Sequence, residues 1–348
     1  MAKTDVAKRV TDALLAYIDT ERASLAPEAG PLLDELESLV TSGGKRLRPR
    51  FCYWGHRAAG GADGVEIVRV GAALELLHTM ALIHDDVMDR SDVRRNRAST
   101  FRALAELSAG VEHRGDPKRF GASAAILTGL LGFALADRLF RTSGFTGDRL
   151  DAASDRYDRL RTTAIAGQYL DLLAAHRGEA DEPTARRIAV LKSGSYSVAD
   201  PLVIGAVLAT DDADVIGPLE AYGLALGEAF QMRDDVLGTF GDAARTGKDR
   251  DGDVREGKQT VLLAKARAAA NDEQRDILDT WVGNPAASGR EIDLVRSVIV
   301  ETGALSDTEK LVESLAHDAR DAIESAPLDP RAVIALNELA RAATERRA

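Results

Sequence analysis

The stretch from Glu75 to Asp89, ELLHTMALIHDDVMD, constrains the fold of this chain more than any other. Its apolar residues recur at helical spacing with no Gly or Pro between them, which predicts a buried helix. Asp85 and Asp89 are four residues apart and share one face of that helix, with Asp86 beside them. Three carboxylates on an apolar helix repel one another, so the stretch predicts a positive group or a metal ion close by.

The ligand atoms that this cluster offers are hard carboxylate oxygens, and no cysteine is near it in the sequence. Mg2+ prefers such oxygens and typically bridges one or two carboxylates to substrate phosphates. A charged patch at a helix end explains the same residues, and the cluster alone leaves both readings open. Glu75 and His78 also match the Glu-x-x-His element of di-iron bundles, but the chain has no second copy, which disfavours that site.

Helical periodicity runs along most of the 348 residues, and alternating runs of strand-forming residues are missing, so we predict an all-α fold with one domain over residues 1–348. The expected helices span residues 4–24, 31–40, 51–59, 65–89, 122–140, 150–175 and 219–237, with others after residue 260. We expect loops at 108–121 and 241–258.

Composition and charge limit the partners and the compartment. The net charge of −11 disfavours nucleic acid, and the single Cys52 excludes an internal disulfide and fits a reducing compartment. The N-terminus does not resemble a signal peptide, and we expect no membrane-spanning segment. These observations predict a cytoplasmic protein.

Basic segments occur on both sides of the aspartate helix. Gly43 and Gly44 precede Lys45 and Arg48, a combination that suits phosphate oxygens, although this motif taken alone favours a solvated basic loop. The spacing is not that of a Walker P-loop. A second basic segment, Arg90–Arg97, directly follows Asp89, and either forms salt bridges with the acids or contributes to a polyphosphate site.

Two histidines lie on the aspartate helix. His78 is two turns before Asp85 on the same face, at a distance that suits a second ligand group, whereas we interpret His84 as a core residue. Further along, Gln168 and Asp171 need polar partners if their helix face is buried, and Lys192 reaches either solvent or a cavity.

A second acidic pair, Asp234 and Asp235, ends a long apolar helix about 150 residues after the first cluster. The polar segment Gly241–Lys258 follows it and is a candidate lid. Its Asp249, Asp251 and Asp253 imitate a calcium loop, but the required Gly and Glu are missing, which excludes an EF-hand.

Six motifs of this chain occur in an order that resembles the polyprenyl synthetase family of trans-prenyl diphosphate synthases. They are GGKRLRP, HDDVMD with two arginines after it, GQYLD, the Lys192 segment, FQMRDD and the loop with its two Gly-Lys pairs. The resemblance covers residues Leu32 to Leu263. It implies an antiparallel bundle around a central cavity, the isoprenoid synthase fold, with two aspartate motifs facing each other. It also implies a Mg2+-dependent prenyltransferase that condenses isopentenyl diphosphate with an allylic diphosphate in a head-to-tail 1'-4 linkage, and a homodimer.

The resemblance assigns site residues one by one. It implies catalytic roles for Asp85, Asp86, Asp89, Lys192 and Asp234. It implies metal ligands at Asp85, Asp86, Asp89, Asp234 and Asp235, which would hold about two to three Mg2+ ions. It places isopentenyl diphosphate at Lys45, Arg48, His78 and Arg95. It places the allylic diphosphate at Arg94, Lys192, Ser193, Gln231, Lys248 and Lys258.

Three positions depart from the family pattern. Gly238 stands where many members have a third aspartate of the second motif, Asn96 where Gly often follows the paired arginines, and Leu130 where an Asp is common. The resemblance places the chain-length floor at Met80 and Ala81. Neither is an aromatic residue, so we expect a C20 product, geranylgeranyl diphosphate.

Other products and functions stay open at this point. A farnesyl or longer product differs only in the floor, and other helices also contribute to it. A class I terpene cyclase shares the fold, but it lacks the FQMRDD motif and the basic Lys45 loop. A regulatory subunit of a heteromeric synthase typically lacks the first aspartate motif, which is intact here.

Overall fold

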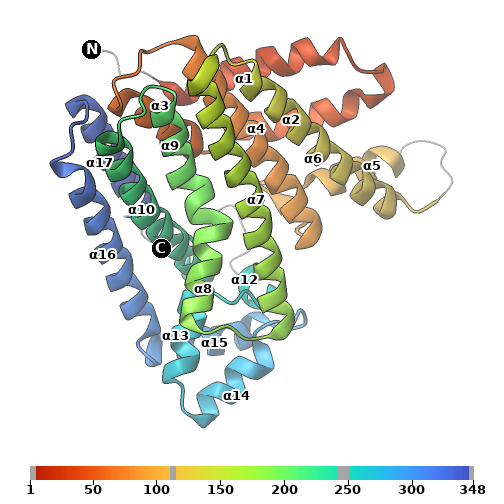
Figure 1. Ribbon diagram of the computed structural model, residues 1–348. Helices are drawn as coiled ribbons and strands as arrows, with labels where there is room; N and C mark the ends of the chain where they lie inside the picture. Colours follow the sequence, from red (N-terminus) through yellow and green to blue (C-terminus); the bar gives the residue numbers. More distant parts are fainter. Residues whose placement is uncertain (1–4, 110–114, 242–250, 345–348) are drawn as a thin grey trace. The chain divides into compact units, whose positions relative to one another are not determined.

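The computed structural model describes residues 5–109, 115–241 and 251–344 (Figure 1). Within these ranges the chain is almost entirely helical, and the strands are a single antiparallel pair of two residues each, β1 (Val93–Arg94) and β2 (Arg97–Ala98). The prediction of an all-α fold is confirmed. The described chain divides into two compact units, which we describe separately. The prediction of one domain, and that of a central cavity, stay predictions.

Unit 1 comprises Met1–Tyr53 and Ala62–Leu150. Its complete elements are the strand pair, α1 (Val6–Arg22), η1 (Pro27–Ala29), α2 (Gly30–Thr41), α4 (Val65–Met88), α5 (Thr100–Ala109) and α6 (Pro117–Arg141). It also contains the start of α3 (Leu47–Ala58) and the start of α7 (Gly147–Arg177).

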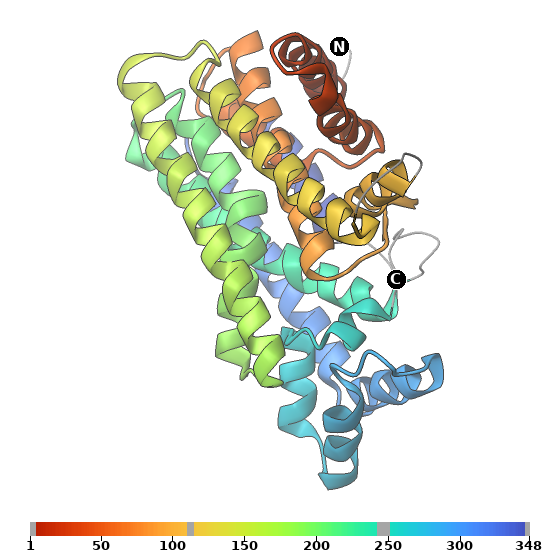
Figure 2. The ribbon, with the colours of Figure 1, turned by 90° about the vertical axis from the view of Figure 1, so that its right-hand side faces the viewer.

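The centre of unit 1 is α4, whose middle is buried on all sides because nearly every residue from Ile67 to Leu77 is apolar. It packs most extensively against α6, and the two ribbons run side by side in Figures 1 and 2. Gly129 of α6 permits this approach, since a Cβ there would lie 2.1 Å from Nε2 of His84 on α4. The aspartates are therefore carried by a rigid core helix.

Unit 2 comprises Trp54–Gly61 and Asp151–Ala348. After α7 its described elements are α8 (Glu182–Ala189), the π-helix η2 (Val190–Ala199), α9 (Asp200–Val207), α10 (Ala213–Phe240), α12 (Gly252–Glu256), α13 (Val261–Ala269), α14 (Asp272–Trp281), α15 (Gly289–Glu301), α16 (Ala304–Glu324) and α17 (Pro330–Thr344).

The centre of unit 2 is α10, which packs against α16 and η2 (Figure 1). Gly194 of η2 and Gly227 of α10 bring the two backbones into contact, because a Cβ on Gly227 would overlap the Gly194 carbonyl. A π-helix is rare and often occurs at functional sites. Here it carries Lys192 and Ser193, and nothing in the local sequence pattern predicts it.

Several expected boundaries need correction. The loop predicted at 108–121 is too long, since α5 continues to Ala109 and α6 starts at Pro117, where Asp116 caps it by accepting a hydrogen bond from the Lys118 backbone. Of the candidate lid, Gly252–Glu256 forms α12, while residues 242–250, which include Lys248, lie outside the described residues.

Two helices, α4 and α6, are long and apolar enough to be candidates for a membrane span, and the expectation of no membrane-spanning segment stays a prediction. Both meet that criterion by length and composition alone. Most of the apolar window of α4, 67%, is buried inside the protein, which is the behaviour of a core helix, while 44% is buried in α6. This is weak evidence for a membrane span.

Candidate active site

The first aspartate motif lies at the C-terminal end of α4, where its members differ in burial. Asp86 is 1% exposed and accepts hydrogen bonds from Nε and Nη2 of Arg94, the first of them 2.7 Å long. Asp85 is half-buried, with Oδ2 3.9 Å from the same guanidinium, and Asp89 caps the helix. The predicted positive group next to the cluster is therefore Arg94.

The hairpin β1–β2 carries Arg94 back onto α4. Its two loop residues, Arg95 and Asn96, have φ of +52° and +60°. A two-residue hairpin loop with positive φ at both positions favours Gly or Asn. Asn96 is thus accommodated where relatives often have Gly. Leu130, the other unexplained departure, is exposed on α6, and nothing in the structure explains it.

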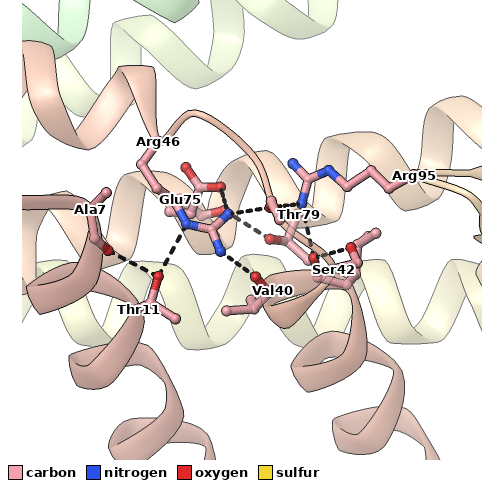
Figure 3. Close-up of polar contacts among 10 residues, drawn as sticks. Ala7, Thr11, Val40, Ser42, Arg46, Glu75, Thr79 and Arg95 are labelled. Atoms are coloured by element: carbon pink, nitrogen blue, oxygen red, sulfur yellow. Dashed lines mark hydrogen bonds and ion pairs between the residues drawn. The ribbon is translucent and has the colours of Figure 1, made fainter. Parts of the chain in front are cut away.

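A buried ion pair anchors the basic loop that precedes α3 (Figure 3). Nη1 of Arg46 lies 2.6 Å from Oε1 of Glu75, and both side chains are at most 4% exposed. The guanidinium also donates to the carbonyls of Val40 and Gly43 and to Oγ1 of Thr11. Glu75 is therefore the counter-ion of Arg46, a partner that the sequence analysis missed.

Arg95 closes the same loop from the hairpin side. Its Nη1 donates to the carbonyls of Leu39 and Gly43, at 2.9 and 2.7 Å. Gly44, with φ +116°, fits because it has no side chain, since a Cβ would lie 2.9 Å from Arg95 Nη2. The loop then presents an exposed Lys45 and leads into α3 with a half-buried Arg48.

His78 lies among these basic groups. Burial, followed by the positive charges of Arg48, Arg95, Arg94 and Arg46, holds the pKa of His78 well below its usual 6.5. The ring is therefore neutral at physiological pH and can donate or accept a hydrogen bond. Arg48 and Arg95 thus lie near enough to His78 for their charges to act on it, and the assignment of all three to isopentenyl diphosphate stays a prediction.

His84, by contrast, belongs to the packing of α4 on α6. Its Nε2 is 3.0 Å from the Ile126 carbonyl, and it fills the space that a Cβ on Gly129 would need. Its interpretation as a structural residue is confirmed. Ala81 and Met80 are half-buried on the same helix.

In unit 2, η2 places Lys192 against α7. Its Nζ lies 2.6 Å from Oδ2 of Asp171, and Gly167 permits the contact because a Cβ there would overlap the Lys192 backbone nitrogen. Asp171, which needed a polar partner, therefore has one. Ser193 follows on the same helix and is half-buried.

The second aspartate motif lies in the last turns of α10. Gln231 Nε2 donates to Oδ1 of Asp235 at 2.7 Å. Burial first, and then the charge of Asp253, raises the pKa of Asp235 to about 8, with smaller contributions from Asp234 and Asp171. Negative charge is thus concentrated at this end of the helix.

Lys258 and Asp253 meet beside that motif. Lys258 Nζ is 2.8 Å from Asp253 Oδ1 and 3.0 Å from Glu256 Oε2. The sequence analysis used Asp253 only to exclude a calcium loop and did not relate it to the second motif.

The described residues contain no group of three or more Asp, Glu, His or Cys side chains arranged to hold a metal ion. What they offer is carboxylate pairs, Asp85 with Asp89 and Asp234 with Asp235. Such pairs fit Mg2+, which takes one or two carboxylates and completes its shell with water and phosphate oxygens. The crowding that raises the pKa of Asp235 is also what a cation would relieve.

Comparisons with known proteins identify the class. The polyprenyl synthetase family model matches residues 31–299. A geranylfarnesyl diphosphate synthase of Aeropyrum pernix is 32% identical, with 83% of this chain and 86% of that protein covered. A geranylgeranyl diphosphate synthase of Sulfolobus acidocaldarius is 28% identical over 92% and 89%. The chain therefore belongs to the polyprenyl synthetase family.

A solved structure agrees with this assignment. The geranylgeranyl pyrophosphate synthase from Corynebacterium glutamicum, complexed with isoprenyl diphosphate and magnesium, is 32% identical, covers 100% of both chains and has a TM-score of 0.95. The protein is thus a prenyltransferase of the trans-prenyl diphosphate synthase family with the isoprenoid synthase fold. The relatives differ in the product that they are named for, so chain length is a separate question.

Proposed function

We propose that this protein condenses isopentenyl diphosphate with an allylic diphosphate to give geranylgeranyl diphosphate, with Mg2+ as cofactor. The observation that carries the proposal is in unit 1, where Arg48 and Arg95 surround a neutral His78 on the helix that ends in Asp85 and Asp89. Cationic groups and a neutral hydrogen-bonding ring suit a diphosphate, and the carboxylates of the same helix suit its counter-ions.

In this proposal the basic groups of unit 1 bind isopentenyl diphosphate. Arg48 and Arg95 contact its phosphate oxygens, Lys45 adds a charge from the exposed loop, and His78 donates a hydrogen bond. The Arg46–Glu75 pair holds the loop in place. Because Arg95 also fixes the Gly43 carbonyl, its side chain is positioned before the substrate arrives.

The groups of unit 2 bind the allylic diphosphate in this proposal. Lys192, Ser193, Gln231, Lys258 and Lys248 contact its oxygens. The ion pairs of Lys192 with Asp171 and of Lys258 with Asp253 support the assignment, since each holds its ammonium in one place.

The residues support chemistry that stabilises a leaving group. Bound Mg2+ would neutralise the diphosphate as it departs, held by Asp85, Asp86, Asp89, Asp234 and Asp235. Lys192 adds positive charge where the allylic carbon–oxygen bond breaks. A bond then forms between that carbon and C4 of isopentenyl diphosphate, and a proton is lost to restore an allylic product.

A C20 product follows from the side chains below the first motif. Met80 and Ala81 lie one turn above Asp85 on α4, and neither is bulky enough to stop chain growth at C15. The cytoplasmic location remains part of this proposal, as does a homodimer. The exposed apolar side chains on α6, Phe120, Ile126, Leu127 and Leu130, support the dimer.

The test is an incubation with Mg2+, labelled isopentenyl diphosphate and, separately, dimethylallyl, geranyl and farnesyl diphosphates, with product length read by mass spectrometry. We expect a C20 product that requires Mg2+ and is lost in Asp85→Asn. The matched control is Asp92→Asn, an aspartate 66% exposed just beyond the motif, which should retain activity. A C15 or longer product would refute the chain length, and no product with any starter would refute the function.

A further inference from the structure

Gly238 stands in the last turns of α10, at the position where the family resemblance implies a third aspartate. The structure shows what fills the space. A Cβ built on Gly238 would overlap Oδ2 of Asp253 and lie 3.0 Å from its Cγ. The Asp253 carboxylate therefore occupies the place that a side chain at position 238 would need.

The segment that carries Asp253 is anchored independently of Gly238. Val254 is buried, Arg255 donates to the Ala287 carbonyl at 3.1 Å, and Arg296 Nη2 lies 2.7 Å from Oδ1 of Asp251. Helix α12 is thus fixed to unit 2 on both sides of Asp253. The position of the Asp253 carboxylate is accordingly set by its own helix.

The two carboxylate oxygens of Asp253 face different partners. Oδ1 accepts a hydrogen bond from Lys258 at 2.8 Å, while Oδ2 lies over Gly238. Asp235 lies three residues before Gly238 and on the same face of α10. One side chain therefore links the second aspartate motif to Lys258.

We propose that Gly238 and Asp253 act as a pair, in which the missing side chain at position 238 seats the Asp253 carboxylate beside the second aspartate motif and Asp253 positions Lys258 there. This proposal rests on the proposed function, since Lys258 is assigned to the allylic diphosphate. It also gives a reason for a glycine inside a helix, where alanine is normally more stable.

The steric part is tested by a double-mutant cycle on the thermal midpoint, Tm, of Gly238→Ala, Asp253→Ala and the double variant. Gly238→Ala should raise Tm in the Asp253→Ala background, because helix propensity improves and nothing is displaced. In the wild-type background it should raise Tm less or lower it. The control is Asp307→Ala, an acid of α16 that is 61% exposed and pairs with Lys310, which should leave the effect of Gly238→Ala unchanged. Equal shifts in all backgrounds would overturn the pairing.

The positioning part is tested by steady-state kinetics. Asp253→Asn should raise KM for the allylic diphosphate about tenfold, equivalent to 1.4 kcal/mol, and leave KM for isopentenyl diphosphate unchanged. Gly238→Asp alone should also impair the enzyme, because two carboxylates compete for one space. Gly238→Asp with Asp253→Ala should recover part of the lost activity relative to either single variant.

The outcomes separate this inference from the proposed function. Wild-type condensation with an unchanged allylic KM in Asp253→Asn would overturn the positioning role and leave the function intact. No condensation by the wild type would overturn the function and the positioning role together, and the Tm cycle would still decide whether Gly238 and Asp253 share one space.

Discussion

Breaking the Arg46–Glu75 pair is expected to destabilise the protein strongly. Both side chains are at most 4% exposed, and the two atoms of the ion pair are 2.6 Å apart. Removing one member of a buried pair leaves an uncompensated charge, which costs about 3–5 kcal/mol. For Glu75→Gln we expect the lower end, about 3 kcal/mol, because Arg46 keeps its hydrogen bonds to two carbonyls and the amide still offers an acceptor oxygen.

The assay is equilibrium unfolding in urea, followed by circular dichroism, of Glu75→Gln, Arg46→Met and the double variant Arg46→Met/Glu75→Leu. The double variant buries no unpaired charge and should lose less stability than the two single changes together. The matched control is Arg22→Ala. Its pair with Asp34 has the same 2.6 Å separation, but the side chains are 34% and 62% exposed, so we expect a loss below about 1 kcal/mol.

The same variants test whether the pair positions the basic loop. Because Arg46 and Arg95 both hold the Gly43 carbonyl, Glu75→Gln should raise KM for isopentenyl diphosphate more than KM for the allylic substrate. A stability loss no larger than that of Arg22→Ala, or single effects that simply add in the double variant, would refute this reasoning.

Three further predictions follow from other parts of the structure. The pKa of His78 is lowered in the folded protein, so below pH 6.5 the unfolded chain gains a proton that the folded chain does not. This lowers the free energy of unfolding by up to about 1.4 kcal/mol per pH unit, and His78→Gln should remove this pH dependence. The free energy of unfolding in urea is measured at pH 6.5 and 5.5, and an equal change between the two pH values in the wild type and in His78→Gln would contradict this. Met80→Phe should shift the product from C20 to C15 by mass spectrometry, and an unchanged product would refute the floor. Leu127→Asp, 57% exposed on α6, should halve the mass measured by light scattering, whereas Val300→Asp, 53% exposed on α15, should not; an unchanged mass would place the interface elsewhere.

The sequence predicts elements whose information is local. The burial of α4 and the helical class follow from apolar periodicity, and the predicted bounds of that helix, 65–89, match Val65–Met88 closely. The end of α5 was missed because Ser108 in its last turn, with Gly110 directly after the helix in the sequence, is typical of a loop. The π-helix was missed because it depends on the contact between Gly194 and Gly227, which are far apart in the sequence.

Within each motif, the sequence cannot separate residues that face a ligand from residues that hold the site together. Asp85 and Asp86 are adjacent and chemically identical, yet Asp86 is 1% exposed and paired with Arg94, whereas Asp85 is half-buried. Each neighbour's role is decided by a partner that only the folded chain supplies. The assignment of Asp86 to metal and of Arg94 to the allylic diphosphate accordingly stays a prediction.

In the basic loop before α3, too, one charged residue holds the segment in place while its neighbours face the ligand, and this arrangement has a physical cause. Arg46 is neutralised by Glu75, so the charge that the loop presents comes from its neighbours Lys45 and Arg48. A segment that binds a highly charged ligand must stay in place when the ligand is absent, although its own charges repel one another. One internal ion pair per segment meets that requirement, and burial makes the pair strong only while both members are present. Glu75→Gln should therefore impair binding through the position of its neighbours, and a variant that restores neutrality, such as Arg46→Met/Glu75→Leu, should recover stability without recovering affinity.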